Sequence, residues 1–444
     1  MPYAAPAFPF LASYASRQSS VPILLDNVAW WRAFYDPVLD ALIKRALEGS
    51  PDLDLAKERI REAQANMAAV PGMAALSADA ALTREGQING PHATRSEASL
   101  GLSWMLDPYG VRRDQINAAR ARIEVADAET DAAQLLLLLN ISNSYVDLRY
   151  SQRLLQIRQQ EMRARQQTLD LVQKMFDQHS ATRLDLISVE ARLAETETAI
   201  PGIKSAIQSQ KFQLAVLLGM NPGTLNIRLD NGPQPQAGLS PEVGIPADLL
   251  RNRPDIKIAE RLYYASVAEV GVAEANLYPK LSLGGAITLA TIGGNSSTDY
   301  YFGPALQLPA FPGTSRRAVV AARQSQARQA HIAWKSTVLD AILEVETALL
   351  EYSGASSSVR SAQKAVRLYR EAVELTRDLV LQEGATVRDL LDADKLVSDA
   401  ELTLAENQRL LNRSFIRLNV SLGSGTTHAQ TPALPASDGL TPGQ

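Results

Sequence analysis

One stretch decides the fold: Arg251-Asn-Arg-Pro-Asp-Ile-Lys-Ile-Ala-Glu-Arg261, which continues through Val272-Ala-Glu-Ala-Asn-Leu-Tyr-Pro279 to Lys280-Leu-Ser-Leu-Gly-Gly-Ala-Ile-Thr-Leu289. Pro254 and Asp255 predict a helix start, because proline presets φ at a first-turn position and a carboxylate there complements the helix dipole. In the third segment the apolar residues fall two apart, which is strand spacing. The stretch therefore predicts a helix that passes directly into a β-strand.

The same plan occurs earlier in the chain. Pro51-Asp52-Leu53 opens a helix that leads through Pro71 into the alternating segment Leu76-Ser-Ala-Asp-Ala-Ala-Leu-Thr83. Further motifs recur 204 residues later: Arg112-Arg113 as Arg316-Arg317, Ala181-Thr182 as Ala385-Thr386, Asp185-Leu186 as Asp389-Leu390, and Leu218-Gly219 as Leu422-Gly423. A fixed offset over this length indicates an internal duplication, so the sequence predicts two tandem repeats, residues 37–219 and 251–423.

Four segments of the chain alternate between apolar and polar or small residues. They lie near residues 74–84, 96–106, 280–290 and 299–308, and they predict two β-hairpins, one in each repeat. A soluble protein can pack two such apolar faces together as a small sandwich. A run of about ten alternating residues is also the length of a strand that crosses an outer membrane.

Each hairpin is followed by a helix of unusual length, residues 111–178 and 315–382, in which Gly354 is the one candidate break. At about 1.5 Å per residue, either helix extends roughly 100 Å. Short turns then reverse the chain into return helices over residues 184–218 and 388–422, where apolar residues recur every seven positions. This repeat predicts a coiled-coil helical hairpin in each copy, and Pro201 is expected to kink the first return helix.

The remaining segments are predicted to be irregular. Residues 1–36 are expected to form an extended N-terminal arm, residues 220–250 a Pro- and Gly-rich linker, and residues 424–444 a flexible tail. The aromatic cluster that ends the arm is expected to be a packing anchor rather than a ligand site, since aromatic side chains bury the most apolar area per residue. Its members are Trp30, Trp31, Phe34 and Tyr35.

Composition excludes several classes of protein. The net charge is −4 with both signs interspersed, and there is no cysteine, so neither nucleic-acid binding nor a disulfide or thiolate metal site is indicated. The four histidines are scattered and no catalytic or phosphate-binding motif is present, so we expect neither an enzyme nor a cofactor. The leucine run 135–139 is far below the roughly 20 apolar residues of a membrane-spanning helix, and no signal peptide is recognised at the start of this numbering.

Four strands with one apolar face leave two open sheet edges, and each unpaired backbone group costs several kcal/mol in hydrocarbon. Several copies are therefore expected to share one barrel, with their long helices aligned below it as a tube. The alternative is a periplasmic coiled-coil adaptor or scaffold without a pore. Such a scaffold does not need four amphipathic strands, and it should stay monodisperse without detergent.

Several motifs resemble those of the TolC-type outer-membrane efflux proteins, in particular the lipoprotein branch that serves resistance-nodulation-division pumps. They are Pro-Asp-Ile256, Ala259-Glu-Arg261, Val272-Ala-Glu-Ala-Asn276, Tyr278-Pro-Lys-Leu-Ser-Leu283, Trp30-Trp-Arg-Ala-Phe34 and Asp36-Pro-Val-Leu39. The resemblance covers nearly the whole chain from Trp30 to Gly423. One departure is that members of this branch usually begin with a lipidated cysteine, whereas this sequence contains no cysteine.

The resemblance implies a mainly α-helical protein with a membrane β-barrel portion. Three copies would form a twelve-stranded barrel that continues into a twelve-helix barrel, with a belt around the middle that includes the linker. It implies the outer-membrane channel component of a tripartite efflux pump, a passive duct for small molecules such as drugs or metals. The implied partners are a periplasmic adaptor and an inner-membrane pump, and the implied location is the outer membrane of a Gram-negative bacterium, extending into the periplasm.

By position, the resemblance also implies the functional residues. Asp389 and Asp392, with Asp185 from the first copy, would close a periplasmic gate, held by salt bridges from Arg388 or Lys395. The turns that dock on the adaptor would comprise Ser180, Ala181, Thr182, Gly384, Ala385 and Thr386. The alternative for Asp185 and Asp389 is that they cap helix starts.

Six further residues are expected at the membrane interface: Trp104, Tyr278, Arg112, Arg113, Arg316 and Arg317. The arginine pairs follow the strands in both repeats, where long cationic side chains can reach lipid phosphates. The alternative is that they occupy an ordinary solvated first helical turn.

Overall fold

The computed structural model describes residues 5–9, 28–86, 88, 92–224, 227, 229–236, 252–308, 313–382 and 384–426. This part of the chain is mainly helical and contains a four-stranded antiparallel sheet. Its contacts divide it into two compact units. The first combines residues 1–8, 57–129 and 255–337, and the second combines residues 9–56, 130–254 and 338–444. Each unit takes segments from both repeats, so the units cut across the duplication.

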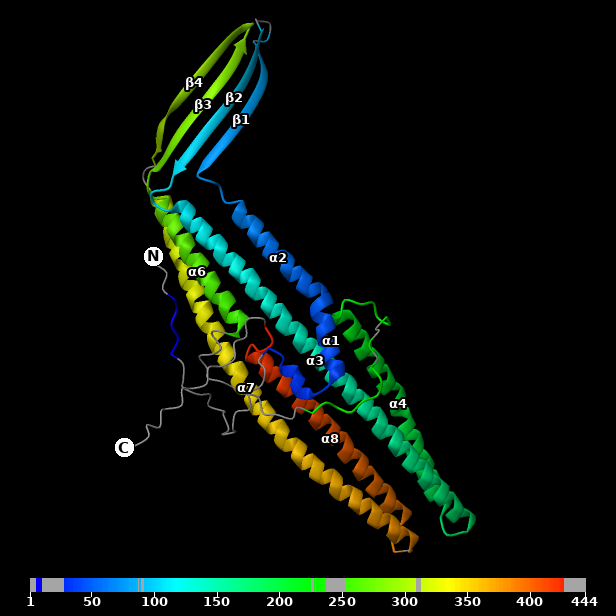
Figure 1. Ribbon diagram of the computed structural model, residues 1–444. Coiled ribbons are helices and arrows are strands. Elements are labelled where there is room, and N and C mark those ends of the chain that lie inside the picture. The colour runs from blue at the N-terminus through cyan, green and yellow to red at the C-terminus, as the bar shows by residue number, and fades with distance from the viewer. Residues whose placement is uncertain are drawn as a thin grey trace, which may run out of the picture. The chain divides into compact units, whose positions relative to one another are not determined.

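The sheet belongs to the first unit and joins the two repeats. Its strands are β1 (Ala74–Gly86), β2 (His92–Leu106), β3 (Lys280–Ile292) and β4 (Asn295–Gln307), and they lie side by side in that order (Figure 1). β1 with β2 and β3 with β4 are the two predicted hairpins, and the β2–β3 contact connects one repeat to the other. Within the described residues, β1 and β4 each have a partner strand on one side alone.

The register gives the sheet one apolar and one polar face. Ala78, Leu100, Ile287 and Tyr300 form one row across all four strands, while Asp79, Ser99, Thr288 and Asp299 form the adjacent row on the opposite face. The apolar row is open to solvent in the single chain, with Leu100 50% and Tyr300 82% exposed. All four strands lie in one sheet, so the alternative of a small sandwich is wrong.

Four helices join the strands in the first unit: α2 (Pro51–Ala68), α3 (Val111–Asp177), α6 (Pro254–Ala275) and α7 (Thr314–Leu381). α3 and α7 continue from the first unit into the second. α7 is helical through Gly354, so the candidate break is not used. No helix in the described ranges combines the length and the apolarity that a bilayer crossing requires.

The second unit contains η1 (Trp30–Phe34), α1 (Pro37–Gly49), α4 (Arg183–Leu217) and α8 (Val387–Ser421), together with the distal parts of α3 and α7. Trp30 and Phe34 are buried and meet Phe415 at ring distances of 6.2 and 5.3 Å, which confirms the packing anchor for these two residues. Tyr35, the last member of the predicted cluster, is 78% exposed. The α3 positions with coiled-coil spacing fill the same core: Leu138, Ile141, Tyr145 and Leu148. α4 continues as one helix through Pro201.

The tail prediction needs a correction at its beginning. Ser424 and Thr426 are buried. Trp30 Nε1 donates a hydrogen bond to the Ser424 carbonyl at 3.2 Å, and Gln134 Nε2 donates to the Gly425 carbonyl at 2.6 Å. These side chains satisfy backbone groups that a solvated tail would leave to water. The prediction for residues 427–444 lies outside the described residues.

The linker and the arm are described in part. Gln152 Nε2 donates to the Leu229 carbonyl at 3.0 Å and Asn412 Nδ2 donates to the Pro235 carbonyl at 2.6 Å, so residues 229–236 lie between α3 and α8. In the arm, Phe8 meets Trp334 edge-on at 6.3 Å. Residues 10–27 and 237–251 lie outside the described residues.

Candidate functional site: the reversing turns and the contacts behind them

The two turns that reverse the chain share one local structure. Thr182 precedes α4, where its hydroxyl accepts a hydrogen bond from Asp185 N at 3.2 Å and its own N–H donates to Asp185 Oδ2 at 2.9 Å. Thr386 and Asp389 repeat this arrangement before α8 with the same two distances. Each Thr-x-x-Asp unit is a capping box, which satisfies backbone donors that the first helical turn leaves open.

Further hydrogen bonds from the threonines stabilise the ionised form of both carboxylates. The hydroxyl of Thr182 donates to Asp185 Oδ2 and that of Thr386 donates to Asp389 Oδ2, each at 2.6 Å. These side-chain hydrogen bonds, followed by those from the threonine N–H groups, lower the pKa of Asp185 and of Asp389. The capping alternative therefore describes both residues, and any role in a gate would be additional to it.

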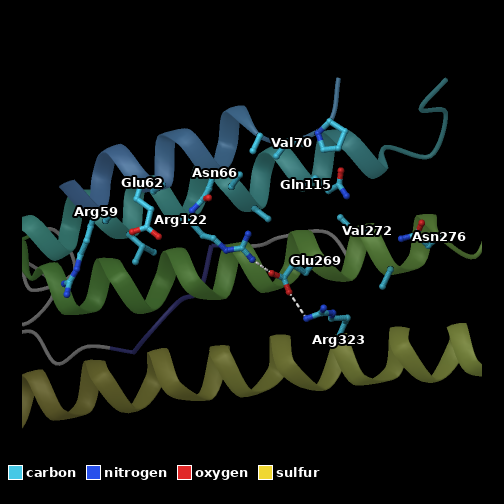
Figure 2. A pocket seen from close by; sticks show the side chains of 18 of the residues that line it. Arg59, Glu62, Asn66, Val70, Gln115, Arg122, Glu269, Val272, Asn276 and Arg323 are labelled. Carbon is cyan, nitrogen blue, oxygen red and sulfur yellow. Dashed lines mark hydrogen bonds and ion pairs between the residues drawn. The ribbon is translucent and has the colours of Figure 1, made fainter. Parts of the chain in front are cut away.

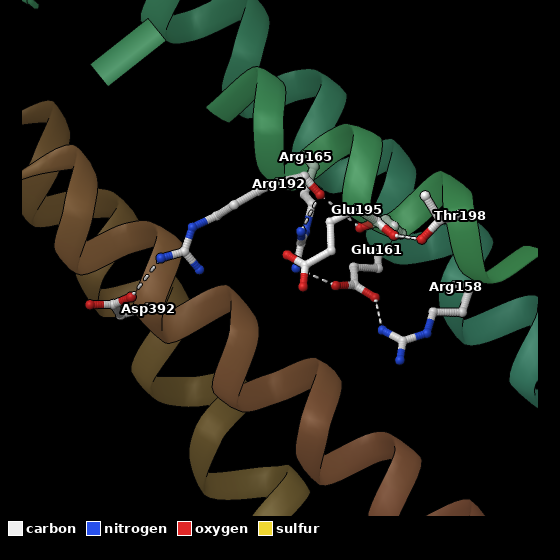
Figure 3. A network of polar contacts seen from close by, with 8 residues as sticks. Arg158, Glu161, Arg165, Arg192, Glu195, Thr198 and Asp392 are labelled. Atoms are coloured by element: carbon white, nitrogen blue, oxygen red, sulfur yellow. Dashed lines mark hydrogen bonds and ion pairs between the residues drawn. The ribbon is translucent and has the colours of Figure 1, made fainter. Parts of the chain in front are cut away.

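Asp392 forms an ion pair that the sequence does not predict. Arg192 of α4 donates from Nη2 to Asp392 Oδ1 of α8 at 3.2 Å, and the Asp392 side chain is about half exposed (Figure 3). Among the described residues of the single chain, neither Arg388 nor Lys395 forms an ion pair, although the charge of Arg388 helps to lower the pKa of Asp389. Their salt bridges to the gate carboxylates of an assembled channel stay a prediction. Arg192 belongs to α4 and Asp392 to α8, so this ion pair connects the two return helices.

The backbone of Arg192 is held by a second layer of charged groups, shown in Figure 3. Arg165 of α3 donates from Nη1 to the Arg192 carbonyl, and its other amino group pairs with Glu161. Glu161 also pairs with Arg158 at 2.7 Å. The guanidinium that reaches Asp392 is therefore carried by a helix segment whose position is fixed from α3.

Apolar packing joins the two helical hairpins just behind the turns. Val172, Leu186, Val189 and Leu391 form a buried cluster that combines α3, α4 and α8. Ala181 and Val387 pack against it and are partly buried. Ala385 is also half-buried, whereas the other four predicted docking residues are exposed: Ser180, Thr182, Gly384 and Thr386. The exposed part of each turn is consequently small and polar.

Asp394 is a half-buried acid near the same network. Burial raises the pKa of its carboxyl group, and Arg377 and Arg165 oppose that rise in part. Its Oδ2 atom is inaccessible to solvent and accepts no hydrogen bond from the described residues. A carboxyl group in this position is costly to ionise, because desolvation penalises the charged form.

The side chains of three of the four arginines that follow the strands form hydrogen bonds or ion pairs within the described part of the chain. Arg112 Nε donates to the Pro71 carbonyl at 3.0 Å, and Arg316 Nη1 donates to the Asn276 carbonyl at 2.8 Å. In both repeats the first arginine thus ties the start of a long helix to the end of the short helix before the hairpin. Arg113 pairs with the adjacent Asp114 at 3.1 Å.

Two residues that sequence reasoning missed also shape this junction. Asp107 caps α3, accepting from Val111 N at 2.6 Å and Arg112 N at 2.9 Å. Tyr109 stacks on the half-exposed Tyr278 at 4.5 Å. The Asp-Pro-x-Gly sequence before α3 is the signal that would have indicated the cap. Trp104 lies at the same end of β2 and is also half-exposed.

The first unit contains a groove of about 780 Å³ between α2, α3 and α6 (Figure 2). Half of its 20 lining residues are alanine or valine, and the lining also includes Glu269 and two arginines that contact it. Arg122 of α3 and Arg323 of α7 both pair with this carboxylate, the latter at 2.9 Å. One carboxylate is thus shared by two guanidinium groups, and these ion pairs join α3, α6 and α7. The described residues contain no group of three or more His, Asp or Glu side chains placed to hold a metal ion.

The fold defines a class of protein: a duplicated chain in which each repeat joins a membrane-length β-hairpin to a long helical hairpin. The family model described as "Outer membrane efflux protein" matches residues 42–220 and 245–424. The chain belongs to this family. The predicted fold class is thereby confirmed, and since the family is one of transport proteins, the chain is not an enzyme.

Two relatives and one solved structure illustrate the similarity. "Nodulation protein T" of Rhizobium leguminosarum bv. trifolii is 32% identical, covering 95% of this chain and 93% of the relative. "Cation efflux system protein CusC" of Escherichia coli (strain K12) is 25% identical and covers 95% of both chains. The solved outer-membrane channel OprN is 27% identical, with a TM-score of 0.87 over 96% of this chain and 98% of that one.

Proposed function

We propose that three copies of this chain form a passive export duct, with a twelve-stranded barrel in the outer membrane and a twelve-helix barrel extending into the periplasm of a Gram-negative bacterium. An inner-membrane pump and a periplasmic adaptor would deliver small molecules to it. The class of outer-membrane efflux channel follows from the family. The trimer, the passive mechanism and the partners are our proposal.

One observation carries the proposal, namely the sheet with an exposed apolar face and two open edges. The row from Ala78 to Tyr300 crosses all four strands without a covering layer among the described residues, and β1 and β4 bound the sheet. Such a surface suits lipid, but open strand edges do not. Further copies of the same sheet satisfy both conditions by closing a barrel.

The number of copies follows from the interior that a duct requires. Each copy contributes four strands. Two copies would give a barrel of about eight strands, whose interior is just wide enough to be filled by side chains. Three copies are the smallest assembly with a wider lumen, in agreement with the resemblance described above. The pore-free scaffold has no specific observation in its favour, because it gives no reason for the apolar face.

The reversing turns are the proposed periplasmic end of the duct. The exposed Thr182 and Thr386 turns would meet the adaptor, and Asp392 would contribute to the gate. The support for the gate is the Arg192–Asp392 ion pair at 3.2 Å, which connects the first helical hairpin to the second. Asp185 and Asp389 would act chiefly by keeping the turns ordered.

The experiment is single-channel conductance in planar bilayers. The variant Asp389→Asn with Asp392→Asn is expected to conduct severalfold more than the unmodified channel, because the α4–α8 ion pair is lost while the side-chain size is kept. Asp399→Asn, an exposed position on the same helix, is the matched control and should leave conductance unchanged. Equal conductance of all three channels would refute the gate, and a chain that is monomeric and forms no channels would refute the duct.

A further inference from the structure

We propose that β4 of one copy pairs in antiparallel fashion with β1 of the next copy, in the register that places Ala305 opposite Ala81 of the neighbouring copy. This register rests on the proposed duct, and it specifies which residues meet where the barrel closes. The carrying feature is the β2–β3 contact, because it already shows how a first-repeat hairpin meets a second-repeat hairpin.

The alignment of the two hairpins comes from their own pairing. Leu76 lies opposite Leu102 in the first hairpin, and Leu281 lies opposite Leu306 in the second. When these two pairs are superposed, leucine matches leucine and the apolar faces of the two hairpins coincide. It relates β1 to β3 by an offset of 205 residues and β2 to β4 by an offset of 204. The second offset equals the one between Arg112 and Arg316, which follow β2 and β4 in the chain. The same alignment of the two repeats therefore holds for the strands and for the helices after them.

The register follows by applying these offsets to the β2–β3 contact. Gly101 lies opposite Ala286 there. Moving Gly101 forward by 204 residues gives Ala305 in β4, and moving Ala286 back by 205 residues gives Ala81 in β1. A slip by one residue is excluded, because it would place the apolar face of one copy beside the polar face of its neighbour.

The side chains that this register brings together are compatible on both faces. The pair Leu100–Ile287 of the β2–β3 contact corresponds to Pro304 opposite Leu82 of the neighbour. Both residues are apolar and lie on the apolar face. The pair Ser103–Gly284 corresponds to Gln307 opposite Asp79 of the neighbour. On this polar face the Gln307 amide can donate a hydrogen bond to the Asp79 carboxylate. Leu82 is 74% exposed in the single chain and would be covered in part by the neighbouring strand.

Disulfide trapping tests the register, because the chain has no cysteine of its own. Directly opposed residues have Cα atoms about 4.5–5.5 Å apart, which a disulfide spans, whereas residues two positions off are about 7–8 Å apart and are not bridged. The test variant combines Ala81→Cys with Ala305→Cys. The slipped controls combine Ala305→Cys with Asp79→Cys or with Thr83→Cys. Ser99→Cys with Thr288→Cys, opposed within one chain, shows that oxidation is effective.

The full-length variants are oxidised in outer membranes, heat-denatured and separated without reductant. The Ala81–Ala305 pair should give covalent dimers and trimers at least tenfold more abundantly than either slipped pair, and reductant should abolish them. Stronger linkage in a slipped pair would overturn the register. If no pair links while native mass measurement still shows a trimer, β4 does not meet β1 and the inference fails alone. A monomer would instead remove the proposed function.

Discussion

Polar side chains near the reversing turns differ in how completely their partners compensate them. Asp185 and Asp389 each accept two hydrogen bonds from a threonine, and Asp392 accepts one from Arg192. Asp394, by contrast, keeps one buried oxygen without a donor among the described residues. The first two carboxylates stabilise the helix starts when ionised, whereas ionisation of Asp394 works against the packing around it.

Asp394→Asn is therefore expected to raise the melting temperature of the purified channel at neutral pH, by about 2 °C. The sign follows from its raised pKa in the folded chain, since an acid that is harder to ionise when folded costs stability above that pKa. The gain should shrink as the pH falls through the raised pKa of the folded state and vanish below about 3, where the carboxyl is protonated in both states. Melting curves at several pH values measure this.

The control for that measurement is Asp389→Asn. Its carboxyl has a lowered pKa, so the stability that it supplies is present at neutral pH and is lost as the pH falls through that lowered value. The two variants should therefore shift the melting temperature in opposite directions at pH 7. A loss of stability in both would show that Asp394 is compensated after all.

At the scale of elements, the long helices depend on a few buried positions with coiled-coil spacing. Leu186 is 2% exposed and belongs to the cluster that joins α4 to α3 and α8, while Leu184, two residues earlier, is 72% exposed. The same residue type thus occupies a core position and a surface position within one helical turn.

Leu186→Ala should destabilise the chain by about 2–4 kcal/mol, because it removes buried methyl groups and leaves a cavity. Leu184→Ala makes the same chemical change at the surface and should cost less than about 0.5 kcal/mol. Thermal or denaturant unfolding of the detergent-solubilised channel distinguishes them. Equal effects would mean that the cluster behind the turns does not hold the helical hairpins together.

The regular elements were predictable because each has a local signal. Strand alternation, seven-residue spacing and the 204-residue offset gave the hairpins and helices, and Thr-x-x-Asp spacing indicated the caps at Asp185 and Asp389. The Arg192–Asp392 pair has no local signal, because its members lie 200 residues apart. Ser188 and Leu396 occupy the equivalent positions in the opposite repeats, so the duplication did not reveal it either.

At the scale of the whole molecule, the two faces of the sheet should tolerate charge differently. Leu100→Arg places a cation on the apolar face, which would cost about 2–4 kcal/mol near the middle of a bilayer. Ser99→Arg places the same charge on the polar face, which would line the lumen, at lower cost. We expect the first variant to reduce the amount of assembled trimer in membranes severalfold and the second to leave it nearly unchanged, as measured by native gel electrophoresis.

The two open edges of the sheet have a consequence for the life of a newly made chain. Before other copies associate, the outer edges of β1 and β4 expose unpaired backbone N–H and C=O groups that can pair with any extended peptide. The exposed apolar face of the sheet also favours non-specific association. A high concentration of unassembled subunits would therefore favour aggregation over assembly into channels. We therefore expect a chaperone to bind these strands before assembly and to release them only at the membrane.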